Sequence, residues 1–169
     1  MQLLHGWKMK FCWLAFLPAL LCACNDEDDI GAIFVGQTWY LGDFYETSNW
    51  KDDNNEVSLY RGNAEAAEIM RGNGTDCFFI TFQESTFRAK GLGNTFSGTW
   101  SADGKNNRLS FMITEGSAAS GSGLEREITQ KFYDCIRYAE YYRGNTIWLK
   151  FFPKDRKSFM QLTKNRREN

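Results

Sequence analysis

Hydrophobic and polar positions alternate with a period of two in several short runs between residues 36 and 163. The clearest run is 76–83, where Phe78, Ile80 and Phe82 fall on one face. The other face also carries bulky side chains, so a strand buried on both faces is expected. Turns rich in glycine and asparagine separate the runs. The runs that predict strands, about seven in all, are 36–45, 76–83, 86–90, 95–101, 108–114, 146–152 and 158–163.

A hydrophobic stripe with helical spacing extends through residues 124–142 and predicts one long helix in the C-terminal half. Gly144 and Asn145 are expected to end it. A shorter helix is expected over 64–70, where strong helix formers precede a glycine turn. The stripe of the long helix consists of Leu124, Ile128, Phe132, Cys135, Ile136 and Ala139.

These elements predict a mainly β (α+β) fold. Consecutive strands joined by short turns favour an antiparallel meander that curls into a barrel-like sheet. The long helix must bury its apolar stripe, so it is expected to pack on the sheet or across the mouth of the barrel.

The N-terminal segment is typical of an export signal. Residues 11–23 are apolar and, as a helix, would span roughly 20 Å, which is short of the ~30 Å hydrocarbon core. Lys8 and Lys10 precede this run, and Cys24 closes it behind a leucine and a small residue. This ending resembles the lipobox of bacterial lipoproteins, which implies that Cys24 is lipidated and becomes the first residue of the mature protein.

The domain organisation follows from this cleavage. Residues 1–23 are the predicted lipoprotein signal peptide, with Met1 and Met9 as alternative starts. Residues 24–35 are predicted to be a lipidated acidic tether, and residues 36–169 to be a single β domain.

The acidic residues 26–29 bear on where the protein resides. They resemble the surface-export signal of Bacteroidetes lipoproteins, which implies an outer-membrane lipoprotein exposed at the cell surface. The alternative is a solvated tether on a periplasm-facing protein, with the acids keeping the domain off an anionic membrane. A covalent lipid on Cys24 would supply the attachment to the membrane.

The predicted mature chain lacks the chemistry of most hydrolases. Its only histidine, His5, is removed with the signal, which excludes histidine-activated nucleophiles and histidine-based zinc sites. Carboxylate catalysis on glycans is a remote alternative, because no particular pair of acids stands out. We therefore predict no enzyme, no cofactor and no metal site.

The charge of the chain argues against nucleic acid as a partner. Loss of Lys8 and Lys10 leaves 18 of the 20 basic side chains against 21 acidic ones, a net charge of −3. The basic side chains near the C-terminus are expected to form a solvated hairpin tip and a frayed tail. They are Lys154, Arg156, Lys157, Lys164, Arg166 and Arg167.

The remaining candidate site residues are two cysteines and one tryptophan. Cys77 and Cys135 are candidates for a disulfide in an exported chain, and the alternative is two buried apolar thiols. Trp50, in a polar loop, is a candidate partner contact, and the alternative is a loop anchor that packs onto the barrel. The many other aromatic residues predict either a packed interior or a ligand cavity.

The order of the elements resembles the META domain of small bacterial lipoproteins and related uncharacterised Bacteroidetes lipoprotein families. The match lies in residues 36–41, in 80–82 with 91–100, and in the predicted helix followed by 144–149. Gly36 and Trp39 also resemble, more distantly, the opening of lipocalins. These resemblances imply a lipid-anchored β domain without an agreed activity.

Two functional classes follow. The first is a non-catalytic interaction or accessory module, anchored at the outer membrane and binding a protein. The second is a lipocalin-like barrel that binds a small apolar ligand in its interior.

Overall fold

The computed structural model describes residues 26–72, 74–116 and 121–166. Over these residues the chain forms nine strands, three α-helices and two short 3₁₀ turns. The helices are α1 (Asp26–Phe34), α2 (Ala64–Met70) and α3 (Gly123–Arg137), and the 3₁₀ turns are η1 (Asp53–Asn55) and η2 (Gly104–Asn106). The strands are β1 (Thr38–Thr47), β2 (Glu56–Ser58), β3 (Phe79–Phe82), β4 (Thr86–Lys90), β5 (Thr95–Asp103), β6 (Arg108–Gly116), β7 (Tyr141–Gly144), β8 (Trp148–Phe152) and β9 (Ser158–Thr163).

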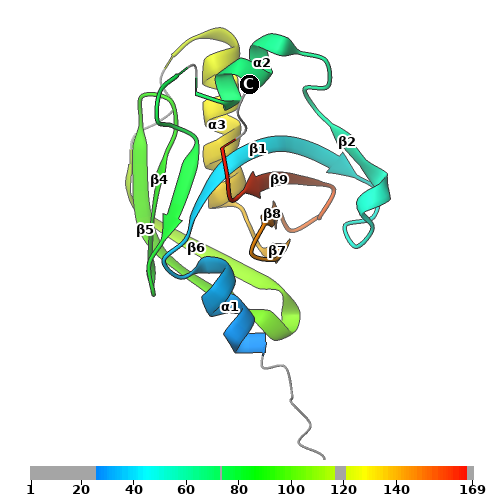
Figure 1. Cartoon of the computed structure of the whole chain (residues 1–169), viewed down its shortest axis with the longest axis vertical. Helices are drawn as coiled ribbons and strands as arrows, with labels where there is room; N and C mark the ends of the chain where they lie inside the picture. The colour runs from blue at the N-terminus through cyan, green and yellow to red at the C-terminus, as the bar shows by residue number, and fades with distance from the viewer. Residues whose placement is uncertain (1–25, 73, 117–120, 167–169) are drawn as a thin grey trace, which may run out of the picture.

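The strands form one antiparallel sheet that closes into a ring (Figure 1). The order is β2-β1-β3-β4-β5-β6-β7-β8-β9, and β1 also pairs with β9. The ring therefore contains eight strands, while β2 is added to one end of β1. The contact between β6 and β7 is short and centres on Arg108 opposite Tyr141.

Strand β1 is long enough to pair with β3 at its start and with β9 along most of its length. The β1–β9 register shifts between Leu41 and Asp43, which indicates a bulge at Gly42. A Cβ on Gly42 would lie 3.1 Å from the Gln161 carbonyl oxygen, so glycine permits this close approach. The bulge lets Leu41 and Phe44 both be buried although they are three residues apart.

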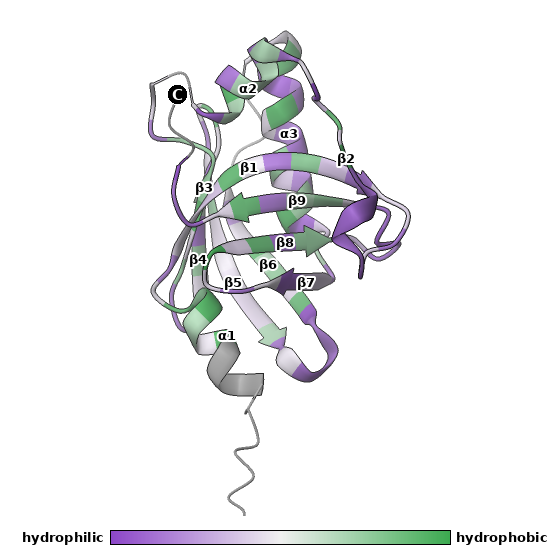
Figure 2. Ribbon diagram, turned by 45° about the vertical axis from the view of Figure 1, so that its right-hand side comes forward, coloured by the Kyte–Doolittle hydropathy of each residue, from purple (hydrophilic) through white to green (hydrophobic). Residues whose placement is uncertain are grey.

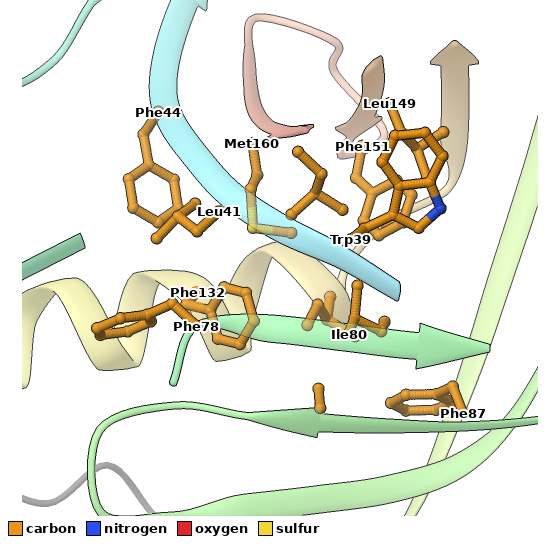
Figure 3. Close-up of a cluster of buried hydrophobic side chains, with 14 of the residues drawn as sticks. Trp39, Leu41, Phe44, Phe78, Ile80, Phe87, Phe132, Leu149, Phe151 and Met160 are labelled. Atoms are coloured by element: carbon orange, nitrogen blue, oxygen red, sulfur yellow. The ribbon is translucent and has the colours of Figure 1, made fainter. Parts of the chain in front are cut away.

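Aromatic and aliphatic side chains fill the interior of the ring (Figure 3). Trp39, Ile80 and Phe151 come from three different strands and are completely buried. From α3, Phe132 reaches the same core, where its ring centroid lies 5.6 Å from that of Phe78. A small closed sheet filled by its own side chains leaves the interior as core.

Helix α3 supplies the part of the core that the sequence predicted, but it is shorter than expected. Its buried residues include Ile128, Phe132 and Ile136. The helix ends at Arg137 rather than near Tyr142, because the Glu140 backbone N–H already donates to the Phe152 carbonyl oxygen in the sheet. The last two residues of the predicted helix, Tyr141 and Tyr142, therefore belong to strand β7.

Helix α1 replaces most of the predicted tether. Phe34 is completely buried, and its ring lies 4.9 Å from that of Trp100 and 5.1 Å from those of Phe82 and Tyr142. The Trp39 indole also donates to the Ile33 carbonyl oxygen at 3.0 Å. The end of α1, with Ile33 and Phe34, therefore packs into the core ahead of the domain boundary that was predicted at residue 36.

The two strands missing from the prediction, β2 and β7, are short. The expectation that 76–83 is buried on both faces is wrong, because Phe79 and Thr81 are only half-buried while Ile80 and Phe82 face the core. Helix α2 lies at one end of the ring and α1 at the other (Figures 1 and 2). None of the helices in the described ranges is both long and apolar enough to cross a membrane.

Candidate functional site

A groove runs along the outside of the ring between helix α3 and strands β1 and β9, with a volume of about 530 Å³. We call it the α3 groove. Its apolar lining is Phe44, Tyr45, Leu59, Cys135, Tyr138, Pro153 and Phe159, and its polar lining is Glu46, Glu127, Gln130, Lys131, Asp134 and Ser158. The volume falls within the range of small-ligand sites, although this groove is open rather than enclosed.

One wall of the groove is a stripe along α3. Glu127, Lys131, Asp134 and Tyr138 follow one another at intervals of four, three and four residues, which places them on one side of the helix. Glu127 is held in place by the Tyr60 hydroxyl, which donates to its carboxylate at 2.7 Å. Burial and this carboxylate together raise the pKa of Tyr60 above its usual range.

The other wall is formed by two stacked aromatic rings on the sheet. The rings of Tyr45 on β1 and Phe159 on β9 stack with centroids 5.0 Å apart and nearly parallel planes. Leu59 follows β2 and is 39 % exposed, while Tyr138 at the end of α3 is 58 % exposed. The groove therefore presents accessible apolar surface between two walls that carry charges.

The neighbouring outer surface is covered by a loop over residues 48–55, here called the covering loop. It lies over β7, β8 and β9 and is tied down by Lys150, whose side chain is almost completely buried. The Lys150 ammonium group donates to Asp53 at 2.8 Å and to Glu56. Arg143 adds a bond of 2.6 Å to the Trp50 carbonyl oxygen.

The pKa of Asp53 in the covering loop and the pKa of Glu56 at the start of β2 shift in opposite directions. The Lys150 ammonium holds the pKa of Asp53 below its usual range. Burial raises the pKa of Glu56, although the same lysine opposes that effect. A buried lysine with two carboxylates ties the covering loop to β8.

Trp50 is half-buried and packs as an anchor of the covering loop. Its ring lies 5.8 Å from that of Tyr141 and 5.6 Å from that of Phe152. The Arg156 guanidinium lies 4.6 Å from the Trp50 ring and 3.8 Å from the Tyr141 ring. This packing fits the loop-anchor alternative, and a partner contact at Trp50 stays a prediction.

Cys77 and Cys135 are both free thiols in this structure, which corresponds to the alternative of two separate thiols and not to the candidate disulfide. They have separate environments: the Cys77 thiol lies 3.3 Å from the Thr75 hydroxyl, whereas Cys135 lines the α3 groove. Burial raises the pKa of both thiols, that of Cys135 to about 12. A thiol that stays protonated at neutral pH is a poor nucleophile, so Cys135 serves the groove as an apolar side chain. Cys24, the predicted lipidation site, lies outside the described residues.

The basic C-terminal end is more ordered than predicted. Lys164 donates to Gln37 and lies over the Trp39 ring. Arg166 forms an ion pair of 2.8 Å with Asp76. The tail is thus packed against the sheet as far as Arg166, and these basic side chains have internal partners.

The α3 groove could not be predicted from local sequence patterns. Leu59 and Glu127 were not singled out, because each is ordinary in its local context. Lys150 was also missed, although one signal was present: residues 149–152 are apolar on both faces apart from this lysine. Such a run requires a cover on the outer face of the sheet. In the described ranges no group of three or more histidine, cysteine, aspartate or glutamate residues is placed to hold a metal ion.

The fold and the site together define a small antiparallel β protein with a filled interior and an external candidate binding groove. The chain belongs to the family described as "Domain of unknown function (DUF4847)", whose model matches residues 25–164. This match includes α1, in agreement with the packing of Phe34 in the core.

Two solved structures share the architecture. The crystal structure of a DUF4847 family protein from Bacteroides vulgatus ATCC 8482 is 27 % identical, with a TM-score of 0.67, and the match covers 82 % of this chain and 99 % of that one. The NMR structure of a protein from Burkholderia xenovorans is 12 % identical, with a TM-score of 0.54 and coverage of 85 % and 90 %, and shows a similar fold alone. None of the curated proteins compared with the chain matches it.

The resemblance to the META domain is wrong, because the chain belongs to the DUF4847 family. The residues that carried it explain the error. Gly36 adopts a left-handed turn with φ of 70°, and Trp39 and Leu149 are core residues. Turn and core positions of this kind are needed by many closed antiparallel sheets, so they do not separate one family from another.

Proposed function

We propose that this protein is a non-catalytic interaction module, lipid-anchored at the outer membrane through Cys24 and exposed at the cell surface, and that it binds its partner in the α3 groove. The observation that carries the proposal is the distribution of apolar surface. The interior of the ring is filled, while Leu59 and Tyr138 leave apolar surface accessible in the groove. The sheet is, in this proposal, a small barrel closed by β1 and β9.

The N-terminal segment supports the anchoring part of the proposal. The apolar run of residues 11–23 ends at Cys24 and is followed by the acidic residues 26–29. Because the core begins at Ile33, few residues separate the anchor from the folded domain. The domain would therefore sit close to the membrane surface.

Anchoring and orientation can be tested in the native host. The wild-type chain is expected to incorporate radiolabelled palmitate and to partition into the detergent phase, whereas Cys24→Ala does neither. Protease treatment of intact cells should degrade the wild-type protein if it faces outward. Full protection in intact cells, with degradation after lysis, would contradict the surface orientation and favour the periplasm-facing alternative.

The lipocalin-like alternative receives no support from the interior, which Trp39, Phe82, Phe151 and their neighbours fill. A small apolar ligand would instead have to occupy the α3 groove, whose 530 Å³ is large enough for one. Native mass spectrometry of the protein purified from its host separates the two classes. A stoichiometric co-purified small molecule would favour the ligand-binding alternative.

A further inference from the structure

We propose that the occupant of the α3 groove is a short protein segment that carries apolar side chains together with lysine or arginine. The inference rests on the proposed function of this groove and names the chemistry of its partner. It is argued from the apolar lining, from the sign and position of the charges, and from the shape of the groove.

The apolar part of the groove is accessible and lacks a cover in the described part of the chain. Phe44 and Phe159 are buried at its base, while Leu59 and Tyr138 project at 39 % and 58 % exposure. Large apolar side chains that stay accessible beside a concave surface mark sites that gain free energy when a partner excludes water. The groove is thus suited to apolar side chains inserted from outside.

The charges around the groove are mainly negative. Glu46 lies on the β1 wall, Glu127 and Asp134 lie on the α3 wall, and Lys131 is the positive member of the lining. The formal charge of the lining is therefore −2. An anionic membrane surface or a nucleic acid would be repelled by this groove, whereas a cationic segment would be attracted.

The spacing of the acids favours an extended chain over a compact ligand. Glu127 and Asp134 are seven residues apart on α3, which corresponds to about 10 Å along the helix axis. This distance matches roughly three residues of an extended peptide. Alternate side chains of an extended chain lie on the same side, so basic residues two or four positions apart would each reach toward a carboxylate, while apolar side chains of the same segment enter the groove.

A second copy of the chain could also insert an apolar side chain into the groove, and the test has to distinguish it from a foreign partner. Ile147 is 69 % exposed, and the Lys164 backbone N–H donates to its carbonyl oxygen at 3.1 Å. Ile147 would therefore form a small apolar projection, whereas the Lys164 ammonium is already bonded to Gln37. Insertion of that projection into the groove of another copy would produce head-to-tail association.

The test uses the full chain in nanodiscs of zwitterionic lipid and a fluorescein-labelled octapeptide of leucine, phenylalanine and lysine. A second peptide replaces each lysine by glutamate. Fluorescence anisotropy at low salt is expected to show binding of the lysine peptide that weakens as salt rises. Equal binding of the glutamate peptide, or no binding of the lysine peptide, would overturn the inference.

Variants in the groove lining, compared with a control variant outside it, test whether the peptide binds in the α3 groove. Glu127→Gln combined with Asp134→Asn keeps an acceptor for Tyr60 and for Gln130, and is expected to weaken binding by about tenfold or more. Leu59→Ala is expected to weaken binding in the same direction. Met112→Ala is the control, because Met112 is 67 % exposed and lies outside the groove lining. An equal loss in the control would place binding elsewhere and overturn the inference.

Sedimentation of the same nanodisc preparation distinguishes the second copy. Association that Ile147→Ala abolishes would show that the groove takes another copy of this chain and would overturn the assignment to a foreign segment. Failure of peptide binding leaves the anchoring and orientation of the proposed function to be decided by the palmitate and protease experiments.

Discussion

Phe34 provides the sharpest test of how the folded domain begins. If residues 24–35 were a tether, replacing Phe34 by alanine would leave stability unchanged. In the structure Phe34 is completely buried and lies within 4.9 to 5.1 Å of the rings of Trp100, Phe82 and Tyr142. The substitution removes these contacts and leaves a cavity between the end of α1 and the sheet.

The expected loss for Phe34→Ala is about 3–5 kcal/mol, because it combines lost transfer free energy with a cavity term. With a urea m-value of about 2 kcal/mol/M, the unfolding midpoint would fall by about 1.5–2.5 M. The assay is equilibrium urea unfolding of the full chain followed by tryptophan fluorescence. Phe34→Leu, which keeps much of the volume, is expected to lose only about 1–1.5 kcal/mol and provides a measurable variant if the alanine protein fails to fold.

Val35→Ala is the matched control for this experiment. Val35 is the next residue and is 36 % exposed, so its truncation is expected to cost about 0.5 kcal/mol or less. Equal and small losses for the Phe34 and Val35 variants would refute the packing of α1 into the core. They would restore the interpretation of this segment as a tether.

Three further predictions concern the covering loop and the groove. Lys150→Met is expected to destabilise the fold by about 2–3 kcal/mol in the same urea assay. This loss is smaller than that expected when a fully buried ion pair is broken, because Asp53 is half-exposed. The control is Lys154→Met, which removes an exposed lysine and is expected to change stability little. Trp50→Ala is expected to accelerate limited proteolysis within the covering loop, compared with the exposed neighbour Lys51→Ala, and unchanged cleavage would contradict the anchoring role. Because burial raises the pKa of Cys135 to about 12, alkylation of this thiol by iodoacetamide at pH 9 should be about tenfold or more slower in the folded protein than after denaturation, and similar rates would contradict this prediction.

Local pattern was sufficient to predict most of the sheet. The strands at 86–90 and 158–163 and the helix at 64–70 lie at their predicted positions, because each has a clear period and is bounded by turn residues. The start of the long helix was predicted to within one residue, whereas its end was predicted too late. Ala139 continues the helical spacing, and only the pairing of Glu140 with Phe152 shows that the chain has joined the sheet.

The features that could not be predicted from the sequence depend on contacts between segments that are distant along the chain. Acidic residues at 26–29 suggested a tether, and the burial of Phe34 depends on Trp100 and Tyr142, which are far away in the chain. The α3 groove likewise joins Leu59, Asp134 and Phe159 from three separate regions. Propensity and periodicity predict single helices and strands, so they cannot predict a groove that several elements form together.

The pairing of β1 with β9 has a consequence for how this chain reaches its folded state. Glu46 lies opposite Ser158, 112 positions later, so the ring cannot close until nearly the whole domain has emerged. Contacts of such wide sequence separation slow folding, because the entropy of closing the intervening loop is lost before the pairing is gained. For a chain that is threaded unfolded across a membrane, as the proposed export requires, this delay would keep the polypeptide competent for translocation until its last strand arrives.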